Sequence, residues 1–176
     1  MVLENKNIKL RSPELKDLDF LFEIENDTSL WHLSNTLSPF SHFDLEQYIL
    51  LADKDIFHTK QLRFIIEVNK STVVGIVDLF DFDPINKRAG IGIIIKDNDK
   101  QKGFASEALE ILFEYSTKIL DLHQLYCNIE SNNKVSLKLF EKKGFVIAGT
   151  KKEWNNRDGV WVDELFLQKI FKNKLN

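Results

Sequence analysis

Three runs of β-branched and aromatic residues lie close together in the middle of the sequence, separated only by short polar turns. They cover Arg63–Val68, Thr72–Phe82 and Arg88–Ile95. Side chains of this kind favour extended backbone. The turns Asn69–Ser71 and Asp83–Asn86 are rich in residues that reverse the chain. We therefore predict an antiparallel meander of three strands at the centre of the fold.

The flanking segments supply further strands and helices. A strand at Ile8–Arg11 precedes a helix that opens at Ser12-Pro13, with serine as N-cap and proline in the first turn. After a loop at Trp31–Phe40, the string Ser41-x-x-Asp44 resembles a capping box and predicts a second helix that continues to Ala52. Downstream of the meander we predict, in order, a helix from Phe104 to Leu120, a strand at Leu125–Glu130, a helix at Asn133–Lys142, and a hairpin of Phe145–Trp154 and Val160–Leu167.

The resulting order, β-α-α-β-β-β-α-β-α-β-β, sets the fold class. It favours an α/β (α+β) arrangement, in which a mixed, mostly antiparallel sheet carries helices on both faces. The chain has 176 residues, 43% of them hydrophobic, which is enough for one sizeable core. Because no repeat or linker divides it, we predict a single domain over residues 1–176.

Charge and cysteine content narrow the class of protein further. The net charge is −3, which argues against a nucleic-acid partner. The single cysteine, Cys127, excludes an internal disulfide, and we expect it to be a small buried side chain. Neither a signal peptide nor an apolar run long enough to span a membrane is apparent. The four histidines lack metal-ligand spacing. We therefore expect a cytoplasmic protein with no metal site and no membrane partner.

A polar loop follows the third strand of the meander and carries the first functional signal. Its sequence is Lys100-Gln101-Lys102-Gly103-Phe104-Ala105-Ser106, and an amphipathic helix comes next. Free N–H groups and the helix dipole make such a helix start an anion site. Gly103 lets the backbone approach a phosphate closely, and two lysines add positive charge. A capped helix start with solvated lysines explains the spacing equally well. The strings of a dinucleotide fingerprint and of a P-loop are both absent.

A second segment, Asn133–Phe145, forms a recognisable pair of motifs together with this loop. The chain resembles the Gcn5-related N-acetyltransferase (GNAT) superfamily. In that family, Gln/Arg-x-x-Gly-x-Gly/Ala binds the pyrophosphate of acetyl-CoA, and Asn-x-x-Ala/Ser-x-x-Leu-Tyr-x-Lys-x-Gly-Phe forms a helix beside the thioester. Both motifs, and the order of elements from Ile8 to Ile170, have counterparts here. The resemblance implies an enzyme that transfers an acetyl group from acetyl-CoA to an amine. The cofactor-binding residues it implies are Ile93, Ile95, Lys100, Gln101, Lys102, Gly103, Phe104, Ala105, Ser106, Asn133, Phe140 and Lys142.

The resemblance also predicts how the donor thioester is held. The backbone of Ile93 and Ile95 would pair with the amides of the pantetheine arm, as a sheet edge pairs with a peptide. Gly92 predicts a bulge that splays this strand from Leu125–Glu130. The carbonyl of the acetyl group would then lie against strand N–H groups, which stabilise the developing oxyanion.

Three positions depart from the family pattern. Lys100 replaces Gln or Arg, Gln101 replaces the usual glycine, and Phe140 replaces a tyrosine thought to protonate the leaving thiolate. Freeing a primary amine of its proton near pH 7 costs roughly 4–5 kcal/mol, whereas leaving the thiolate unprotonated costs about 2 kcal/mol. A missing acid is therefore tolerable. Ser136 matches a serine proposed as the acid in the ribosomal-protein N-terminal acetyltransferase branch. A helix serine that bonds its own backbone is an equally good interpretation.

The general base is predicted from the remaining carboxylates. Asn128 occupies the place of a glutamate found in some relatives, so Asp78 and Glu130 are our candidates, with Glu67 a further one. Asp78 and Asp81 should lie on opposite faces of their strand unless a bulge intervenes. A solvated surface role is an alternative for each carboxylate, and a water chain is an alternative base.

The acceptor is predicted from local strings. Val77–Asp81 is similar to the spermidine N-acetyltransferase branch and favours a small amine or polyamine, although Gly90 stands where that branch has a glutamate. Glu23, Glu25 and Asp27, at the end of the first helix, either line an acidic pocket or form a solvated face. Ser136 and the long final hairpin favour an alternative acceptor, the N-terminus of a peptide. Phe140 favours another alternative, a CoA-binding module without catalytic activity. A homodimer is compatible with the family. Trp154 and Trp161 either shape the acceptor pocket or pack the final hairpin, and we expect packing.

Overall fold

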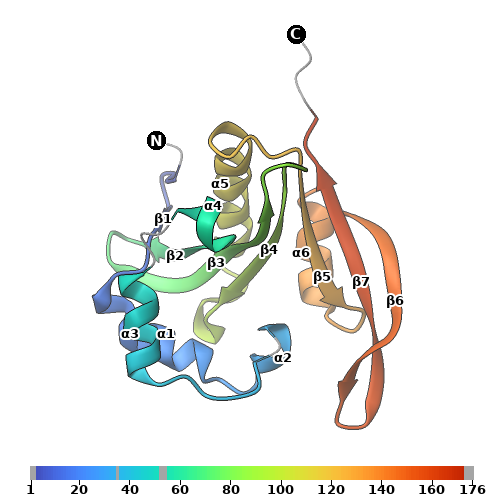
Figure 1. Ribbon diagram of the computed structural model, residues 1–176, viewed down its shortest axis with the longest axis horizontal. Helices are drawn as coiled ribbons and strands as arrows, with labels where there is room; N and C mark the ends of the chain where they lie inside the picture. The colour runs from blue at the N-terminus through green and yellow to red at the C-terminus, as the bar shows by residue number, and fades with distance from the viewer. Residues whose placement is uncertain (1–2, 35, 52–54, 173–176) are drawn as a thin grey trace.

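A seven-stranded sheet organises the molecule, in the strand order β1-β2-β3-β4-β5-β7-β6 (Figure 1). The structure is a computed structural model and describes residues 3–34, 36–51 and 55–172. Its strands are β1 (Ile8–Arg11), β2 (Leu62–Val68), β3 (Thr72–Asp83), β4 (Arg88–Ile95), β5 (Gln124–Glu130), β6 (Val146–Arg157) and β7 (Val160–Ile170). All neighbours are antiparallel except β4 and β5, which are parallel. The predicted meander, β2-β3-β4, is confirmed, as is the mixed and mostly antiparallel sheet.

Helices cover both faces of this sheet, as predicted. They are η1 (Leu15–Asp17), α1 (Leu18–Glu25), α2 (Trp31–Ser34), α3 (His42–Leu50), α4 (Ile56–Thr59), η2 (Asp97–Asp99), α5 (Phe104–Lys118) and α6 (Lys134–Lys142). Alternate residues of β2 point to opposite sides: Ile65 packs in the cluster of α1 and α3, whereas Phe64 and Ile66 pack in that of α5 and α6. This two-sided burial explains why β2 is almost continuously apolar.

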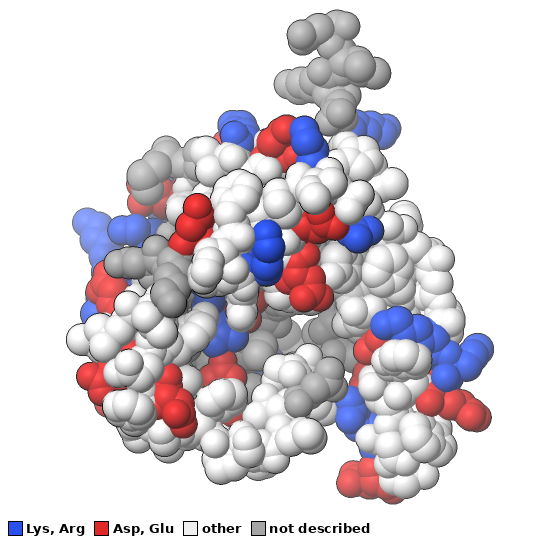
Figure 2. Space-filling view, in the orientation of Figure 1, with Lys and Arg blue, Asp and Glu red and all other residues white. Residues whose placement is uncertain are grey.

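The sheet is interrupted between β4 and β5. These strands pair over only three positions, from Arg88 opposite Gln124 to Gly90 opposite Tyr126, and then diverge. The predicted splay is therefore confirmed, but the predicted bulge at Gly92 is wrong. Gly92 pairs in regular register with Asp78, and the irregular step lies on β3 between Phe80 and Asp83. Beyond the divergence, β6 and β7 form a long hairpin that projects from the body of the molecule (Figures 1 and 2).

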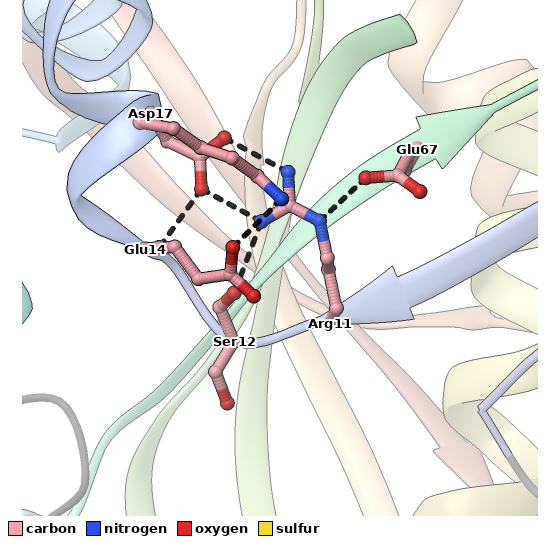
Figure 3. Close-up of polar contacts among 6 residues, drawn as sticks. Arg11, Ser12, Glu14, Asp17 and Glu67 are labelled. Atoms are coloured by element: carbon pink, nitrogen blue, oxygen red, sulfur yellow. Dashed lines mark hydrogen bonds and ion pairs between the residues drawn. The ribbon is translucent and has the colours of Figure 1, made fainter. Parts of the chain in front are cut away.

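The start of the first helix differs from the prediction at Ser12-Pro13. The 3-10 turn η1 begins only after Glu14, because Asp17 takes over the capping: its Oδ2 accepts the Glu14 N–H at 2.8 Å. Both Asp17 oxygens also accept from Arg11, at 2.7 and 2.8 Å, and Arg11 Nε donates to Glu67 at 2.6 Å (Figure 3). The fixed guanidinium of β1 therefore sets the position at which the helix begins.

The second predicted helix begins where expected. In α3 the Ser41 hydroxyl accepts the Asp44 N–H, and Asp44 accepts the Ser41 N–H, each at 3.1 Å. The helix ends at Leu50, and the predicted end at Ala52 lies outside the described residues. The loop predicted at Trp31–Phe40 contains the one-turn helix α2, which periodicity over so short a span does not reveal.

Candidate functional site

The divergence of β4 and β5 opens a cavity of about 570 Å³. Strands β3 and β4 line one side, β5 and α6 line the other, and residues of α2 and of the β6–β7 hairpin close it. Figure 2 shows the surface hollowed between the hairpin and the body, with acidic and basic side chains near the hollow. Predicted residues among the lining are Ile93, Asp78, Glu130, Asn133, Ser136 and Phe140.

The edge of β4 that faces the divergence offers backbone groups. Lys96 N–H donates to the Val74 carbonyl at 2.9 Å, and the β3–β4 register is regular from there to Gly90. Hydrogen-bonded pairs alternate in an antiparallel ladder, so the N–H and C=O groups of Ile93 and Ile95 point away from β3. Among the described strands, none other than β3 pairs with β4 at these positions. An extended chain that carries amides fits such an edge.

The loop before α5 has the backbone of an anion site. Gly103 is the N-cap with φ of 90°, and the first intrahelical bond is from Glu107 N–H to its carbonyl. The N–H groups of Phe104, Ala105 and Ser106 therefore have no carbonyl within the helix. Gln101 also has positive φ, 64°. That conformation is natural for glycine, which accounts for the residue usual in the family at this position.

The lysines of this loop contribute less positive charge than predicted. Lys100 pairs with Asp97 at 2.5 Å, and Lys102 pairs with Asp99 at 2.8 Å. Both acids belong to η2, which directly precedes the loop. The backbone N–H groups are therefore the main attraction for an anion here. Lys142, at the last position of α6, is exposed and is not among the residues that line the cavity.

Helix α6 presents two predicted residues to the cavity. Asn133 caps the helix by accepting the Ser136 N–H at 3.1 Å. The Ser136 side chain makes no hydrogen bond to any described residue, so it does not bond its own helix backbone. Phe140 is buried and packs edge-to-face on Phe145, with ring centroids 5.0 Å apart. Phe140 therefore keeps the aromatic wall that a tyrosine would give, without the hydroxyl.

The predicted base Asp78 is engaged by an arginine. Arg63 Nε and Nη2 donate to the two oxygens of Asp78 at 2.8 and 2.7 Å, and Arg63 Nη1 donates to Glu25. The Tyr48 ring lies 5.5 Å from the guanidinium. Burial lowers the pKa of Arg63, but Asp78 outweighs it, so the pKa lies well above its ordinary value. The guanidinium stays charged.

The opposite wall carries two further ion pairs. Glu130, the other predicted base, pairs with Arg157, whose Nη2 also donates to the His32 carbonyl at 3.3 Å. The hairpin tip thus reaches across to α2. Glu164 accepts from Lys151 at 2.7 Å. Periodicity and family motifs did not single out Arg63, Lys151, Arg157 or Glu164, because an ion pair across strands leaves no local signal.

Other predicted residues lie elsewhere or play a different part. Glu67 binds Arg11 and is not among the cavity residues. Asp81 is exposed and accepts from the Tyr126 hydroxyl at 3.2 Å. Trp154 and Trp161 are each 57% exposed, so neither is packed in the core as expected; Trp154 lines the cavity, which fits the alternative of a pocket role, whereas Trp161 is not among the lining residues. Cys127 is buried as predicted, and burial raises its pKa to about 12, which keeps the thiol protonated at neutral pH.

Gly90 has a packing reason for being glycine. A Cβ at this position would lie 2.2 Å from Cε2 of Phe80, whose ring covers it and lines the cavity. The Phe80 ring therefore fills the space that a side chain at position 90 would occupy. Within residues 3–34, 36–51 and 55–172, no three His, Cys, Asp or Glu side chains gather into a metal site. No helix in these ranges is long and apolar enough to cross a membrane.

Comparisons with known proteins agree with this geometry. A family profile described as "Acetyltransferase (GNAT) domain" matches residues 7–146. The spermidine N(1)-acetyltransferase of Vibrio cholerae is 31% identical over 149 residues, 82% of each chain. That of Escherichia coli is 28% identical over 144 residues, 81% of this chain and 75% of the relative. The crystal structure of spermidine N-acetyltransferase from Vibrio cholerae in complex with CoA and spermine has a TM-score of 0.83 and 28% identity, and it covers 94% of this chain and 96% of that chain.

Proposed function

We propose that the acceptor of this enzyme is a small aliphatic amine, with polyamines favoured. The chain belongs to the GNAT acetyltransferase family and transfers an acetyl group from acetyl-CoA to an amine. One observation carries the proposal: four carboxylates, those of Glu25, Asp78, Glu130 and Glu164, line the cavity beside the free edge of β4. Carboxylates attract an ammonium group. The names of the relatives point to the same acceptor class.

The donor side of the reaction follows from the backbone. The N–H groups at the start of α5 would hold the pyrophosphate of acetyl-CoA, with Gly103 allowing its close approach. The edge of β4 at Ile93 and Ile95 would pair with the amides of the pantetheine arm. The acetyl group would then lie in the divergence, where β4 N–H groups stabilise the oxyanion formed by direct attack of the amine.

The acceptor must lose a proton before it attacks. Glu130 is our proposed base, because Arg157 engages one of its oxygens, whereas both oxygens of Asp78 accept from Arg63. Ser136 would donate a proton to the departing thiolate, since it lines the cavity from α6. Amine deprotonation remains the costlier step by about 2–3 kcal/mol near pH 7, so the base should matter more than the acid.

Replacing the proposed base tests this assignment. Glu130→Gln should lower kcat by about a hundredfold, the order of effect of a general base, while acetyl-CoA binding stays unchanged. Glu164→Gln is the matched control, because it also removes a cavity carboxylate paired with a cation. Steady-state kinetics with saturating acetyl-CoA provide the measurement. Equal losses in both variants would mean that Glu130 acts only through the charge of the cavity.

An acceptor panel tests the function itself. Thiol release from acetyl-CoA should be fast with spermidine, spermine and 1,4-diaminobutane, and slow with peptides that have free N-termini. The reverse order would identify a peptide N-terminal acetyltransferase, the alternative that Ser136 favours. Tight binding of acetyl-CoA without turnover of any amine would identify a non-catalytic CoA-binding module.

A further inference from the structure

Arg63 lies between two carboxylates that come from different elements of the cavity wall. Asp78 belongs to β3, the neighbour of β2, and Glu25 is the last residue of α1. The three side chains are 13%, 19% and 13% exposed for Arg63, Asp78 and Glu25, so they are held mostly by protein. The Trp31 indole N–H donates to the Glu25 carbonyl at 2.9 Å and fixes the backbone there.

The two carboxylates are not equivalent. Arg63 takes both oxygens of Asp78, but it takes only Oε1 of Glu25. Within the described part of the chain, Oε2 of Glu25 has no hydrogen-bond partner. Both residues line the cavity. Glu25 therefore keeps an oxygen available to a ligand, whereas Asp78 is occupied in orienting the arginine.

Charge is also unevenly distributed around the cavity. On the wall formed by β5 and the β6–β7 hairpin, Glu130 pairs with Arg157 and Glu164 pairs with Lys151, so the formal charges cancel. On the other wall, one guanidinium faces two carboxylates and leaves one negative charge. Glu25 stands at the C-terminus of α1, where the helix dipole adds partial negative charge. The excess negative charge of the cavity is thus localised at Glu25.

We infer that Glu25 is the specificity-determining residue for a cationic acceptor, and that Arg63, held by Asp78, is the positioning residue that aims its carboxylate. The inference rests on the proposed function and deepens it. The acceptor class is an aliphatic amine that arrives as a single ammonium at this wall, since one uncompensated charge is available. Aromatic amines, which are neutral at pH 7, gain nothing from Glu25 and should be poor substrates.

Removing the charge of Glu25 tests the inference directly. Glu25→Gln should raise the KM for spermidine ten- to a hundredfold, change kcat less than threefold, and leave the KM for acetyl-CoA unchanged. The steep rise of this KM with salt in the parent protein should flatten in the variant, because the screened charge is gone. Glu114→Gln, which removes an exposed carboxylate paired with Lys118 outside the cavity, should leave the spermidine KM within threefold.

The positioning role is tested by a double-mutant cycle. Arg63→Lys keeps the charge but loses the bidentate grip on Asp78, and it should raise the KM for spermidine about tenfold. In a Glu25→Gln background the same change should have almost no further effect, because there is no carboxylate left to aim. Retained acetyl-CoA affinity in each variant shows that it is folded. Additive effects of the two changes would overturn the positioning role.

Turnover and binding separate this inference from the proposed function. Rapid turnover of spermidine with an unchanged KM in Glu25→Gln would overturn the inference and leave the function standing. Without turnover in the parent protein, calorimetry of spermidine against the acetyl-CoA complex decides the matter: weaker binding in Glu25→Gln would support the inference while the function fails. No binding to the parent protein would overturn both.

Discussion

Gly103→Val is expected to weaken acetyl-CoA binding at least a hundredfold. Gly103 has φ of 90°, and a Cβ there meets no heavy atom within 4 Å, so the cost is backbone strain and not a collision. A β-branched residue in this region costs on the order of 1–3 kcal/mol and is relieved only by turning the loop. Turning it misaligns the N–H groups at the start of α5, each worth roughly 1.5–3 kcal/mol to a charged ligand.

Two matched variants make this measurement decisive. Gly159→Val places the same strain in the hairpin turn, where φ is 85° and the space is also open. It should lower stability but leave acetyl-CoA affinity intact. Lys100→Ala should weaken binding only two- to fivefold, because Lys100 is already paired with Asp97. Isothermal titration calorimetry with acetyl-CoA compares all three. Equal, small effects at positions 100 and 103 would mean that the pyrophosphate lies elsewhere.

Arg11→Met should lower the free energy of unfolding at pH 7 by about 3–5 kcal/mol. The change leaves the carboxylates of Asp17 and Glu67, 2% and 8% exposed, without their cation (Figure 3). Breaking one partner of a buried ion pair has an effect of this size, because the remaining charge is stranded. Lys16→Met removes an ion pair from the same segment, but Lys16 and Glu14 are more than half exposed. It should cost less than about 1 kcal/mol.

The pH dependence of this variant has a defined sign. Burial raises the pKa of Asp17, but hydrogen bonds from Arg11 and from the Glu14 backbone bring it below its ordinary value. A lowered pKa gives stability that is present above the ordinary pKa and is lost as pH falls through the folded value. Without Arg11, burial raises the pKa of Asp17, and protonation removes the buried negative charge. Urea titrations should therefore show the gap between parent and variant beginning to narrow above about pH 4 and continuing to narrow below it. A constant gap would contradict the role of Asp17.

What the sequence predicted correctly depends on short-range physics. The meander, the capping box at Ser41 and the glycine at the start of α5 are set by neighbours a few residues apart, so local patterns reveal them. The start of the first helix was missed because Arg11, on β1, binds Asp17 and so places the start of the helix after Ser12-Pro13. The bulge placed at Gly92 was wrong for a similar reason: the irregular step belongs to the partner strand.

The acceptor side of the cavity was the least predictable. Glu25 lines the cavity, which was one of the two interpretations of the acidic residues at the end of the first helix, but Arg63, Lys151, Arg157 and Glu164, from the three strands β2, β6 and β7, were not predicted. Each is an ordinary surface residue in its own segment, and only the sheet order brings them together. Gly90 shows the same limit, since its reason is the ring of Phe80 on the adjacent strand. The donor side, by contrast, is built from a continuous loop and one strand edge, which a motif captures.

The short seam between β4 and β5 has a consequence for how the molecule comes together. Strands β1–β4 use residues 8–95, and β5–β7 use residues 124–170, so each half of the sheet is assembled from a continuous stretch of chain. Most strand pairings within a half close short loops, which favours rapid assembly. Three paired positions and the shared core under α5 and α6 join the halves. A ligand that lies in the divergence would contact both halves of the sheet. Its binding energy would then stabilise the docking of one half on the other.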